Sequence, residues 1–289
     1  MTTAFVAVSD HVRSYSVSRL GVTPEKCVVI PNGIDFGPFK AVDPHAARTR
    51  LRAQHGLADD EFVFLDVGAI NHQKNHLGMI KAFEIAARTC TKVRLAILGP
   101  CYEEGLLKEM LAYVEKRGLQ GKVFYCGSAS GAQDYLTMAD SFVTATFFEG
   151  GPLTLLEAIA ANIPVAMPAV GRASHFADRQ GIELVDPVHD MEHFNGALWE
   201  MKSTHEFEQR LAEAMVRTWK KPVRPNFSAT ELAALEKGRA YESYVRLITD
   251  IMEVERVSEE GAPVLVPPRQ QLSSTGQSGF APPPAAKCT

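Results

Sequence analysis

The sequence predicts an α/β fold with a parallel sheet and helices on both of its faces. Between residues 62 and 185, short apolar runs alternate with helical patterns, and each run is continuous. Continuous apolar runs are typical of parallel strands that are buried on both faces. Ligands of such sheets bind beyond the carboxyl ends of the strands. We therefore expect the loops that follow residues 67, 98, 126, 146 and 168 to share one crevice.

Before this sheet, the first residues predict a small strand–helix–strand unit and a linker. Ser9 or Asp10 is suited to cap a helix that Gly21 ends, and Pro31-Asn32-Gly33 is a strong turn signal. Turn-forming residues without periodicity predict a linker over 35–44. The expected elements are a strand over 4–8, a helix over 10–20, a strand over 27–30 and a helix over 46–56.

The main sheet is predicted from six apolar runs, and the helices between them from apolar residues at helical spacing. One of these helices carries Leu77, Ile80 and Phe83 on one face. Further helices are expected around 103–116, before Met138 and after Pro152. The six strands are expected over 62–67, 93–98, 123–126, 141–146, 164–167 and 182–185.

The last third of the chain is predicted to be helical and then irregular. Helices are expected over 191–201, 206–219 and 228–254. The last begins with Ser228-Ala229-Thr230-Glu231, which has the form of a capping box. Over 257–289, Pro, Gly, Ser and Gln dominate and periodicity is lost, which predicts a disordered tail.

Composition excludes several classes of protein. A net charge of −4 gives no positive field that would attract nucleic acid or anionic lipid. No apolar run approaches the roughly 18 residues that span a bilayer, so no transmembrane segment is expected, and the first residues lack a signal-peptide pattern. The five cysteines are scattered without a C-x-x-C pair. We therefore expect a cytoplasmic protein without a structural zinc site.

The stretch after the fourth strand carries the clearest chemical signal. It reads Phe147-Phe148-Glu149-Gly150-Gly151-Pro152 and opens a helix that contains Glu157. Two glycines and a proline at a helix start leave free N–H groups at the positive end of the helix dipole, which is a natural anion site. Ionised carboxylates accept hydrogen bonds from sugar hydroxyls. Amides for phosphate between Glu149 and Glu157 describe a nucleotide-sugar pocket.

Over residues 4–255 the motifs, in order, resemble those of retaining glycosyltransferases of GT-B fold, in the large group-1 family with the E-x7-E signature. The E-x7-E element runs from Glu149 to Glu157. The resemblance implies that the sheet is the Rossmann-like carboxyl-terminal half of a GT-B fold. The other matching stretches are Val6-Ala7-Val8-Ser9, Val29-Ile30-Pro31-Asn32-Gly33-Ile34-Asp35, Asp66-Val67-Gly68, Gln73-Lys74-Asn75, Leu95-Ala96-Ile97-Leu98-Gly99, Val123-Phe124-Tyr125-Cys126-Gly127, Asn162-Ile163-Pro164-Val165-Ala166 and Phe227-Ser228.

The resemblance implies a domain that binds a nucleoside diphosphate sugar as donor substrate, with neither a metal nor a cofactor. Glu149 and Lys74 would be the catalytic residues. Glu149 would bind hydroxyls of the transferred sugar, and Lys74 would neutralise the diphosphate together with the amides of Gly150 and Gly151. Glu157 would hold the ribose hydroxyls. The other donor-binding residues implied are Gly68, Pro152, Leu153 and, near the base, Gly127 and Ser128.

The chain departs from the family pattern in three places. Ala69 stands where the family usually has an arginine, which could cost roughly 3 kcal/mol of transition-state stabilisation. His72 and Arg172 are candidates to replace that cation. The loop 171–175 lacks a glutamate that the family often has, and the chain starts at what resembles the last strand of an acceptor domain. The divisions implied are the end of that domain with a hinge (1–43), the donor domain (44–190), helices (191–256) and the tail (257–289).

Two classes of function stay open. The first is an enzyme that transfers the sugar to an unknown acceptor. The second is a nucleotide-sugar-binding protein that does not catalyse alone: a fragment, a degenerate domain, or a split subunit that needs a separate acceptor-domain protein. An epimerase or phosphorylase of the same fold has no specific signal, and a dehydrogenase is disfavoured because no G-x-G-x-x-G follows a strand.

A metal site is also disfavoured. His72 and His76 are four residues apart, but the sequence places no third ligand near them. We expect one of them in a loop and the other on a helix surface.

Overall fold

The main sheet has six parallel strands in the order β5-β4-β3-β6-β7-β8, which confirms the predicted α/β fold. The structure is a computed structural model that describes residues 3–129, 131–189 and 197–259. β6 ends three residues earlier than expected. The strands are β3 (Phe62–Val67), β4 (Val93–Leu98), β5 (Val123–Gly127), β6 (Ser141–Val143), β7 (Val165–Pro168) and β8 (Ile182–Val185).

The direction in which strands are added to this sheet reverses between β3 and β6. From β3 the chain moves outward through β4 to β5, and it then returns to place β6 on the other side of β3. Phe64 lies opposite Ser141 and Leu65 opposite Phe142. At such a switch point the loops after the two central strands lead to opposite faces of the sheet, which leaves a crevice beyond the strand ends.

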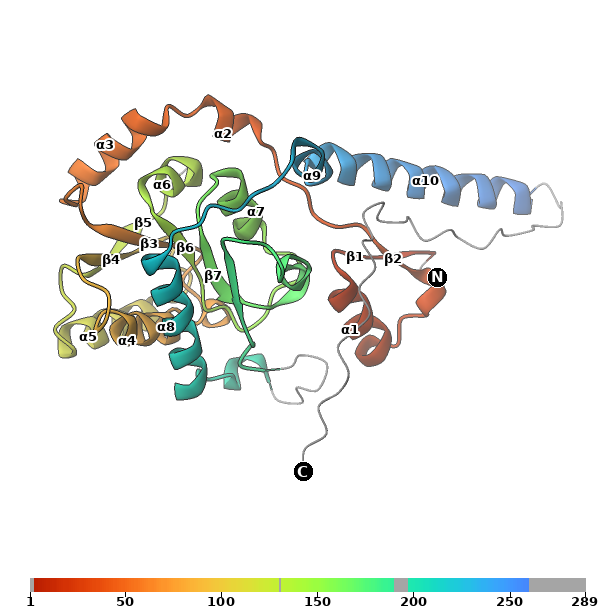
Figure 1. The fold of residues 1–289 in the computed structure, drawn as a ribbon. Coiled ribbons are helices and arrows are strands. Elements are labelled where there is room, and N and C mark those ends of the chain that lie inside the picture. Colours follow the sequence, from red (N-terminus) through yellow and green to blue (C-terminus); the bar gives the residue numbers. More distant parts are fainter. Residues whose placement is uncertain (1–2, 130, 190–196, 260–289) are drawn as a thin grey trace. The chain divides into compact units, whose positions relative to one another are not determined.

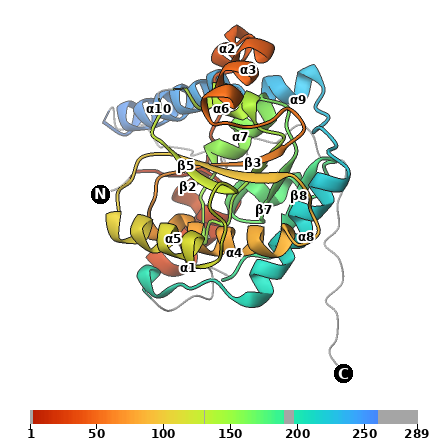
Figure 2. The ribbon, with the colours of Figure 1, turned by 90° about the vertical axis from the view of Figure 1, so that its left-hand side faces the viewer.

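Helices cover both faces of the sheet (Figure 1), and the view turned by 90° shows the same two layers (Figure 2). One layer consists of α3 (Pro44–Gln54), α6 (Ala132–Met138) and α7 (Leu153–Ala160), and the other of α4 (His76–Ala86), α5 (Glu104–Lys116) and α8 (His205–Lys220). Each layer has its own hydrophobic core. The first core includes Leu51, Leu136 and Leu155, and the second includes Met79, Met110 and Leu211.

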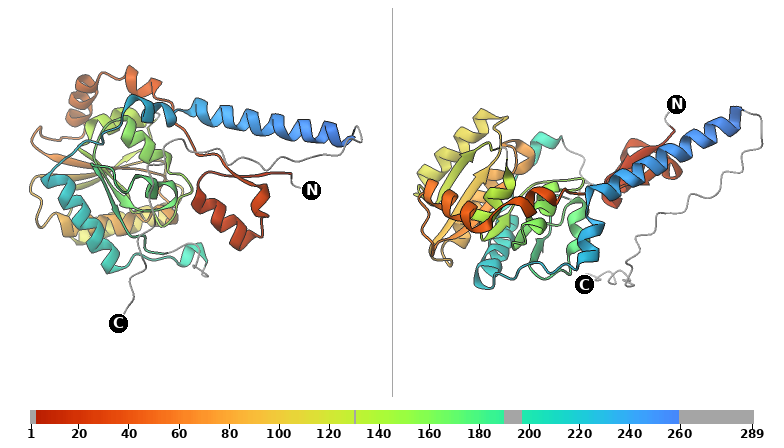
Figure 3. Two further views of the ribbon diagram at one scale, coloured as in Figure 1. Left: turned by 45° about the vertical axis from the view of Figure 1, so that its right-hand side comes forward. Right: turned by 90° about the horizontal axis from the view of Figure 1, so that it is seen from above.

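The first residues form the expected strand–helix–strand unit. β1 (Phe5–Ala7) and β2 (Cys27–Val29) pair in parallel as a sheet of their own, with α1 (Asp10–Leu20) between them (Figure 3). The Ser9 hydroxyl oxygen accepts the N–H of Val12 at 3.2 Å, so Ser9 is the cap. The expected linker contains a short helix, α2 (Gly37–Ala41), which Asp35 initiates by accepting the N–H of Gly37 at 2.8 Å.

The helix expected over 228–254 is two helices, α9 (Ala229–Ala234) and α10 (Lys237–Glu259). They are separate because the backbone between them pairs with Ile34: the N–H of Ile34 donates to Leu235, and that of Lys237 donates to Ile34. The predicted capping box at the start of α9 is confirmed.

The remaining expectations for this region fall partly outside the described residues. Residues 191–196 of the helix expected over 191–201 lie outside them, and the described remainder holds a 3-10 turn at Leu198–Glu200. Of the expected tail, 257–259 belong to α10, and 260–289 lie outside the described part. The chain has two units, residues 1–244 and 245–289. Among the helices described, none has the length and apolar character needed to cross a bilayer.

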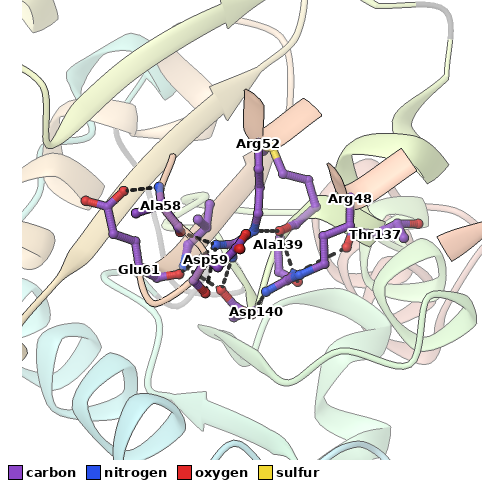
Figure 4. Close-up of polar contacts among 10 residues, drawn as sticks. Arg48, Arg52, Ala58, Asp59, Glu61, Thr137, Ala139 and Asp140 are labelled. Carbon is purple, nitrogen blue, oxygen red and sulfur yellow. Dashed lines mark hydrogen bonds and ion pairs between the residues drawn. The ribbon is translucent and has the colours of Figure 1, made fainter. Parts of the chain in front are cut away.

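Asp140 directly precedes β6 and ties the amino ends of the strands to α3 (Figure 4). Its two carboxylate oxygens each lie 2.7 Å from an arginine, Arg48 on one side and Arg52 on the other. The Arg52 side chain is only 3% exposed and also donates to the carbonyl oxygens of Ala58 and Glu61. Burial lowers the pKa of Arg52, and Asp140 opposes that shift. Arg52 therefore depends on Asp140 for its counter-charge.

Replacing Asp140 tests this dependence. Asp140→Ala leaves a buried guanidinium without its carboxylate, so we expect a loss of about 3 kcal/mol in the free energy of unfolding, measured by urea titration. Arg48→Ala is the control, because the Arg48 side chain is 35% exposed and its loss should cost no more than about 1 kcal/mol. Equal losses in the two variants would contradict the role of burial.

Candidate functional site

The loops after β3 and β6 are joined at the switch point by hydrogen bonds of Gln73. Its carbonyl oxygen accepts the N–H of Phe147 at 2.9 Å and lies 3.2 Å from the Thr146 hydroxyl oxygen. Its side-chain amide donates to the carbonyl oxygen of Phe148 at 2.8 Å. These bonds set the register of the two loops, so that a side chain on one loop has a fixed neighbour on the other.

Lys74 and Glu149 are such neighbours. The Lys74 ammonium lies 2.5 Å from Oε1 of Glu149, and the Thr146 hydroxyl donates to the same oxygen at 3.2 Å. The two side chains are 18% and 15% exposed. The structure thus brings together the two residues that the sequence nominated as catalytic. The ammonium is suited to a phosphate and the carboxylate to hydroxyl groups.

The helix α7 begins beside this pair and has no capping side chain. Pro152 occupies the N-cap position, one residue earlier than the first helical position that the sequence predicted. The first N–H groups of the helix are therefore not satisfied by a cap. An anion at this end would meet these donors and the positive end of the helix dipole. Leu153, the first helical residue, is 49% exposed.

The loop after β7 packs tightly on the backbone of Glu149 and Gly150. Gly171 has a φ of 53°, and a Cβ there would overlap the carbonyl oxygens of both residues. The N–H of Arg172 donates to the carbonyl oxygen of Gly150 at 3.3 Å. Only glycine combines this backbone angle with so close an approach. The loop after β7, which contains the cation Arg172, therefore holds the Gly150-Gly151 segment in place.

The Arg172 guanidinium faces the segment before α2 and has no carboxylate partner among the described residues. It donates to the carbonyl oxygen of Asn32 at 2.8 Å, and the Asn32 amide donates to Gly151 at 3.0 Å. Burial lowers the pKa of Arg172. Of the two candidates to replace the cation missing at Ala69, Arg172 contacts the glycine loop through its backbone N–H, and its guanidinium reaches that loop only through Asn32. The ring of His72 instead packs near Phe147.

Glu157 lies one and a half turns into α7. Burial raises the pKa of its carboxyl group. Within the described residues no side chain or backbone group donates a hydrogen bond to it. Glu157 is partly buried, and a carboxylate without donors in such a place is costly to a folded protein, so this acid is an acceptor available to a ligand.

Three glycines lie side by side at the ends of β3, β4 and β5. The N–H of Gly99 donates to Gly127 at 2.9 Å, and a Cβ at Gly99 would overlap the carbonyl oxygen of Gly68. The Lys74 side chain passes close to Gly68, since its carbons would lie 3.4 Å from a Cβ at position 68. Ser128 follows Gly127 and is exposed. Gly99 was not among the nominated site residues, although the Gly99-Pro100 pair at a strand end marks it.

The prediction for His76 is wrong, since this residue is buried rather than on the helix surface. Its Nε2 lies 3.0 Å from Oδ2 of Asp66, and the side chains are 0% and 1% exposed. The reason is the turn before α4, where Asn75 has a φ of 51° and directs the first helical residue toward β3. In the part of the chain that the structure describes, no three metal-ligating side chains come together.

Comparison with known proteins places this geometry in context. The family model described as "Glycosyl transferases group 1" matches residues 47–217, which is more than half of the chain. A curated relative from Campylobacter jejuni, N-acetylgalactosamine-N,N'-diacetylbacillosaminyl-diphospho-undecaprenol 4-alpha-N-acetylgalactosaminyltransferase, is 32% identical over 161 residues, covering 55% of this chain and 38% of that protein. The UDP-Gal:alpha-D-GlcNAc-diphosphoundecaprenol alpha-1,3-galactosyltransferase of Escherichia coli is 25% identical, covering 68% of this chain and 50% of that protein. The chain thus spans half or less of the length of these relatives.

Solved glycosyltransferases share the fold. A glycosyltransferase from Rickettsia africae aligns with a TM-score of 0.66 at 15% identity, covering 87% of this chain and 64% of that one. HepE of Anabaena, solved in complex with UDP and glucose, aligns with a TM-score of 0.64 at 18% identity, covering 87% and 63%. These neighbours confirm the GT-B type of sheet.

The partial burial of Glu157 predicts that stability depends on pH. Because burial raises the pKa of Glu157, the folded chain keeps this proton to a higher pH than the unfolded chain, whose glutamates titrate near about 4.3. The contribution of Glu157 to stability therefore falls as pH rises from about 4.3 through the pKa that Glu157 has in the folded chain. We expect Glu157→Gln to be more stable than the parental chain at pH 7 and the difference to shrink as pH is lowered, measured by urea unfolding at several pH values.

The control for this experiment is Glu109→Gln, because Glu109 lies exposed on α5. Its stability should follow that of the parental chain across the same pH range. A gain for Glu157→Gln that does not change with pH would contradict the assignment of the effect to its titration.

Proposed function

The chain belongs to the glycosyl transferases group 1 family, and from this membership we propose that it binds the nucleoside diphosphate sugar used by a glycosyltransferase. The observation that carries the proposal is the contact between Lys74 and Glu149 beside the uncapped start of α7. It joins one group suited to phosphate and one suited to sugar hydroxyls at the switch point of the sheet, where ligands of such folds bind.

When the donor binds, Lys74 and Glu149 separate, and each takes a partner on the donor. The diphosphate lies against the Gly150-Gly151 amides and the first turn of α7, and Lys74 turns from Glu149 toward it. Glu149 is then free to accept hydrogen bonds from the hydroxyls of the transferred sugar. Glu157 accepts the ribose hydroxyls, which satisfies a carboxylate that has no donors without the ligand. Lys74 and Glu149 thus have a partner in both states, and Glu157 gains one when the donor binds.

Transfer retains the configuration of the sugar and needs neither a metal nor a cofactor in this proposal. Lys74 and the helix N–H groups stabilise the negative charge that develops on the departing diphosphate. Arg172 supplies part of the positive potential that Ala69 does not. The base lies over the glycines at the ends of β4 and β5, near Gly127 and Ser128. The acceptor is not identified, and a cytoplasmic location stays a prediction from the sequence.

The second candidate is a nucleotide-sugar-binding protein that needs a separate acceptor-domain protein for transfer. Ala69 favours it, because one cation fewer faces the leaving group than in the family pattern. A transfer assay separates the two candidates. Turnover by the chain alone excludes the second, and turnover only after an acceptor-domain protein is added supports it.

Calorimetry with UDP, GDP and ADP tests the binding step that both candidates share. UDP is the first choice, because HepE of Anabaena was solved with it. We expect one of the three nucleotides to bind, and the absence of binding for all of them at millimolar concentration would refute the proposal.

Lys74→Ala tests the role of the ammonium. Hydrogen bonds to charged groups contribute about 1.5–3 kcal/mol, so we expect the affinity for the nucleoside diphosphate to fall by roughly 10- to 100-fold in calorimetry. The matched control is Lys81→Ala, which removes a lysine of the neighbouring α4 whose partner is Glu208 at 3.6 Å. The control should bind as the parental chain does. A comparable loss in both variants would point to a general effect of charge.

A further inference from the structure

Asp66 and His76 form a contact in the interior of the protein, at the base of the loop that carries Lys74. His76 Nε2 lies 3.0 Å from Asp66 Oδ2, and neither side chain is more than 1% exposed. Within the described residues, none of the polar side-chain atoms of Asp66 and His76 has a hydrogen-bond partner of good geometry, so this approach is their one polar contact. Buried polar groups without a hydrogen bond are uncommon, because burial removes the hydrogen bonds that they make with water.

Neither stability nor direct chemistry accounts for this pair. Replacing both members of a buried polar pair by apolar side chains of similar volume is often neutral or stabilising, so such a contact is weak evidence of a stabilising role. Direct chemistry is excluded because side chains this deeply buried do not touch a substrate. Positioning of a neighbouring group is the role that remains.

The geometry identifies the group that is positioned. Asp66 belongs to β3, where it is paired with Ile97 of β4 and cannot shift along the sheet. His76 is the first residue of α4. The contact between them closes the loop 67–75 at its base, and Lys74 lies two residues before the closing histidine. The position of Lys74 therefore depends on where His76 is held.

Two further contacts leave this end of the loop little freedom. The N–H of Lys74 donates to the Asn71 side chain at 3.1 Å. The Asn75 amide donates to the carbonyl oxygen of Ala145 at 3.0 Å, which ties the turn to the loop that carries Glu149. Asn75 has a φ of 51°, a left-handed conformation that asparagine adopts more readily than most residues other than glycine. A contact that holds the next residue in place helps to maintain it.

We propose that Asp66 and His76 are a positioning pair that holds the turn 71–75 so that Lys74 meets the second phosphate of the donor. The inference rests on the proposed function and adds to it two residues that do not touch the ligand. Its consequence is specific: loosening the pair lowers affinity for the diphosphate and leaves recognition of the nucleoside monophosphate part unchanged. A merely structural pair would not discriminate between the two nucleotides.

The experiment compares His76→Gln with His76→Asn. Both side chains end in an amide, but only the glutamine amide reaches the position of Nε2, so only His76→Gln keeps a donor for Asp66. The readout is the ratio of UDP affinity to UMP affinity in calorimetry. We expect His76→Gln to keep this ratio within about twofold, and His76→Asn to lower it by roughly tenfold, toward the value of Lys74→Ala.

A double variant and a control complete the design. Asp66→Val with His76→Leu replaces the pair by apolar side chains, which should preserve folding and lower the ratio as His76→Asn does. Asp140→Ala weakens the fold at the opposite ends of the strands and should leave the ratio of UDP affinity to UMP affinity unchanged.

The outcomes separate the inference from the function on which it rests. If the parental chain prefers UDP to UMP and the glutamine and asparagine variants have the same ratio, the positioning role is overturned and the proposed function stands. If the double variant folds and has the same ratio of UDP affinity to UMP affinity as the parental chain, the positioning role is likewise overturned. A parental chain that binds neither these nucleotides nor the guanosine and adenosine pairs overturns the proposed function and the inference together.

Discussion

The pairing of β6 with β3 is the constraint on which the candidate site depends. It brings together two loops whose key residues, Lys74 and Glu149, are 75 positions apart in the chain. It also sends the following helices, α4 and α7, to opposite faces of the sheet, so the crevice between the loops stays open. The bonds of Gln73 and the ion pair form only because this pairing has aligned the strand ends. The site is thus a property of the topology more than of any single motif.

Elements fixed by local signals could be predicted from the sequence. β3, β4 and β8 have the expected bounds, since each is a mainly apolar run with one charged residue and ends at turn-forming residues. Ser9 and Gly21 likewise define α1 by capping its ends. The break between α9 and α10 could not be predicted, because it depends on the pairing of Ile34 with a backbone about 200 positions later. Tertiary contacts of that kind leave no periodic signal.

The same distinction applies to the site. Glu149 and Lys74 could be nominated from motifs, and the structure places them in contact. The burial of His76 could not be foreseen, because helical spacing does not fix which way the first residue of a helix faces. That direction follows from the left-handed backbone of Asn75. Gly99 was missed because its neighbour Gly68 follows another strand, β3, and only the assembled sheet brings the two glycines close.

The charged groups at the amino ends of the strands have partners of opposite charge, whereas, within the described part of the chain, two charged groups near the carboxyl ends lack them. At the amino edge, Asp140 is saturated by two arginines, and the buried Arg52 finds further acceptors in the backbone. At the carboxyl edge, Glu157 and Arg172 are both shifted in pKa by burial alone, without an opposite charge beside them. Such groups lower the stability of the free protein, and natural sequences tolerate local conflicts of this kind mainly at functional sites. In the proposed function, the hydroxyls and phosphates of a nucleoside diphosphate sugar give these two groups their partners.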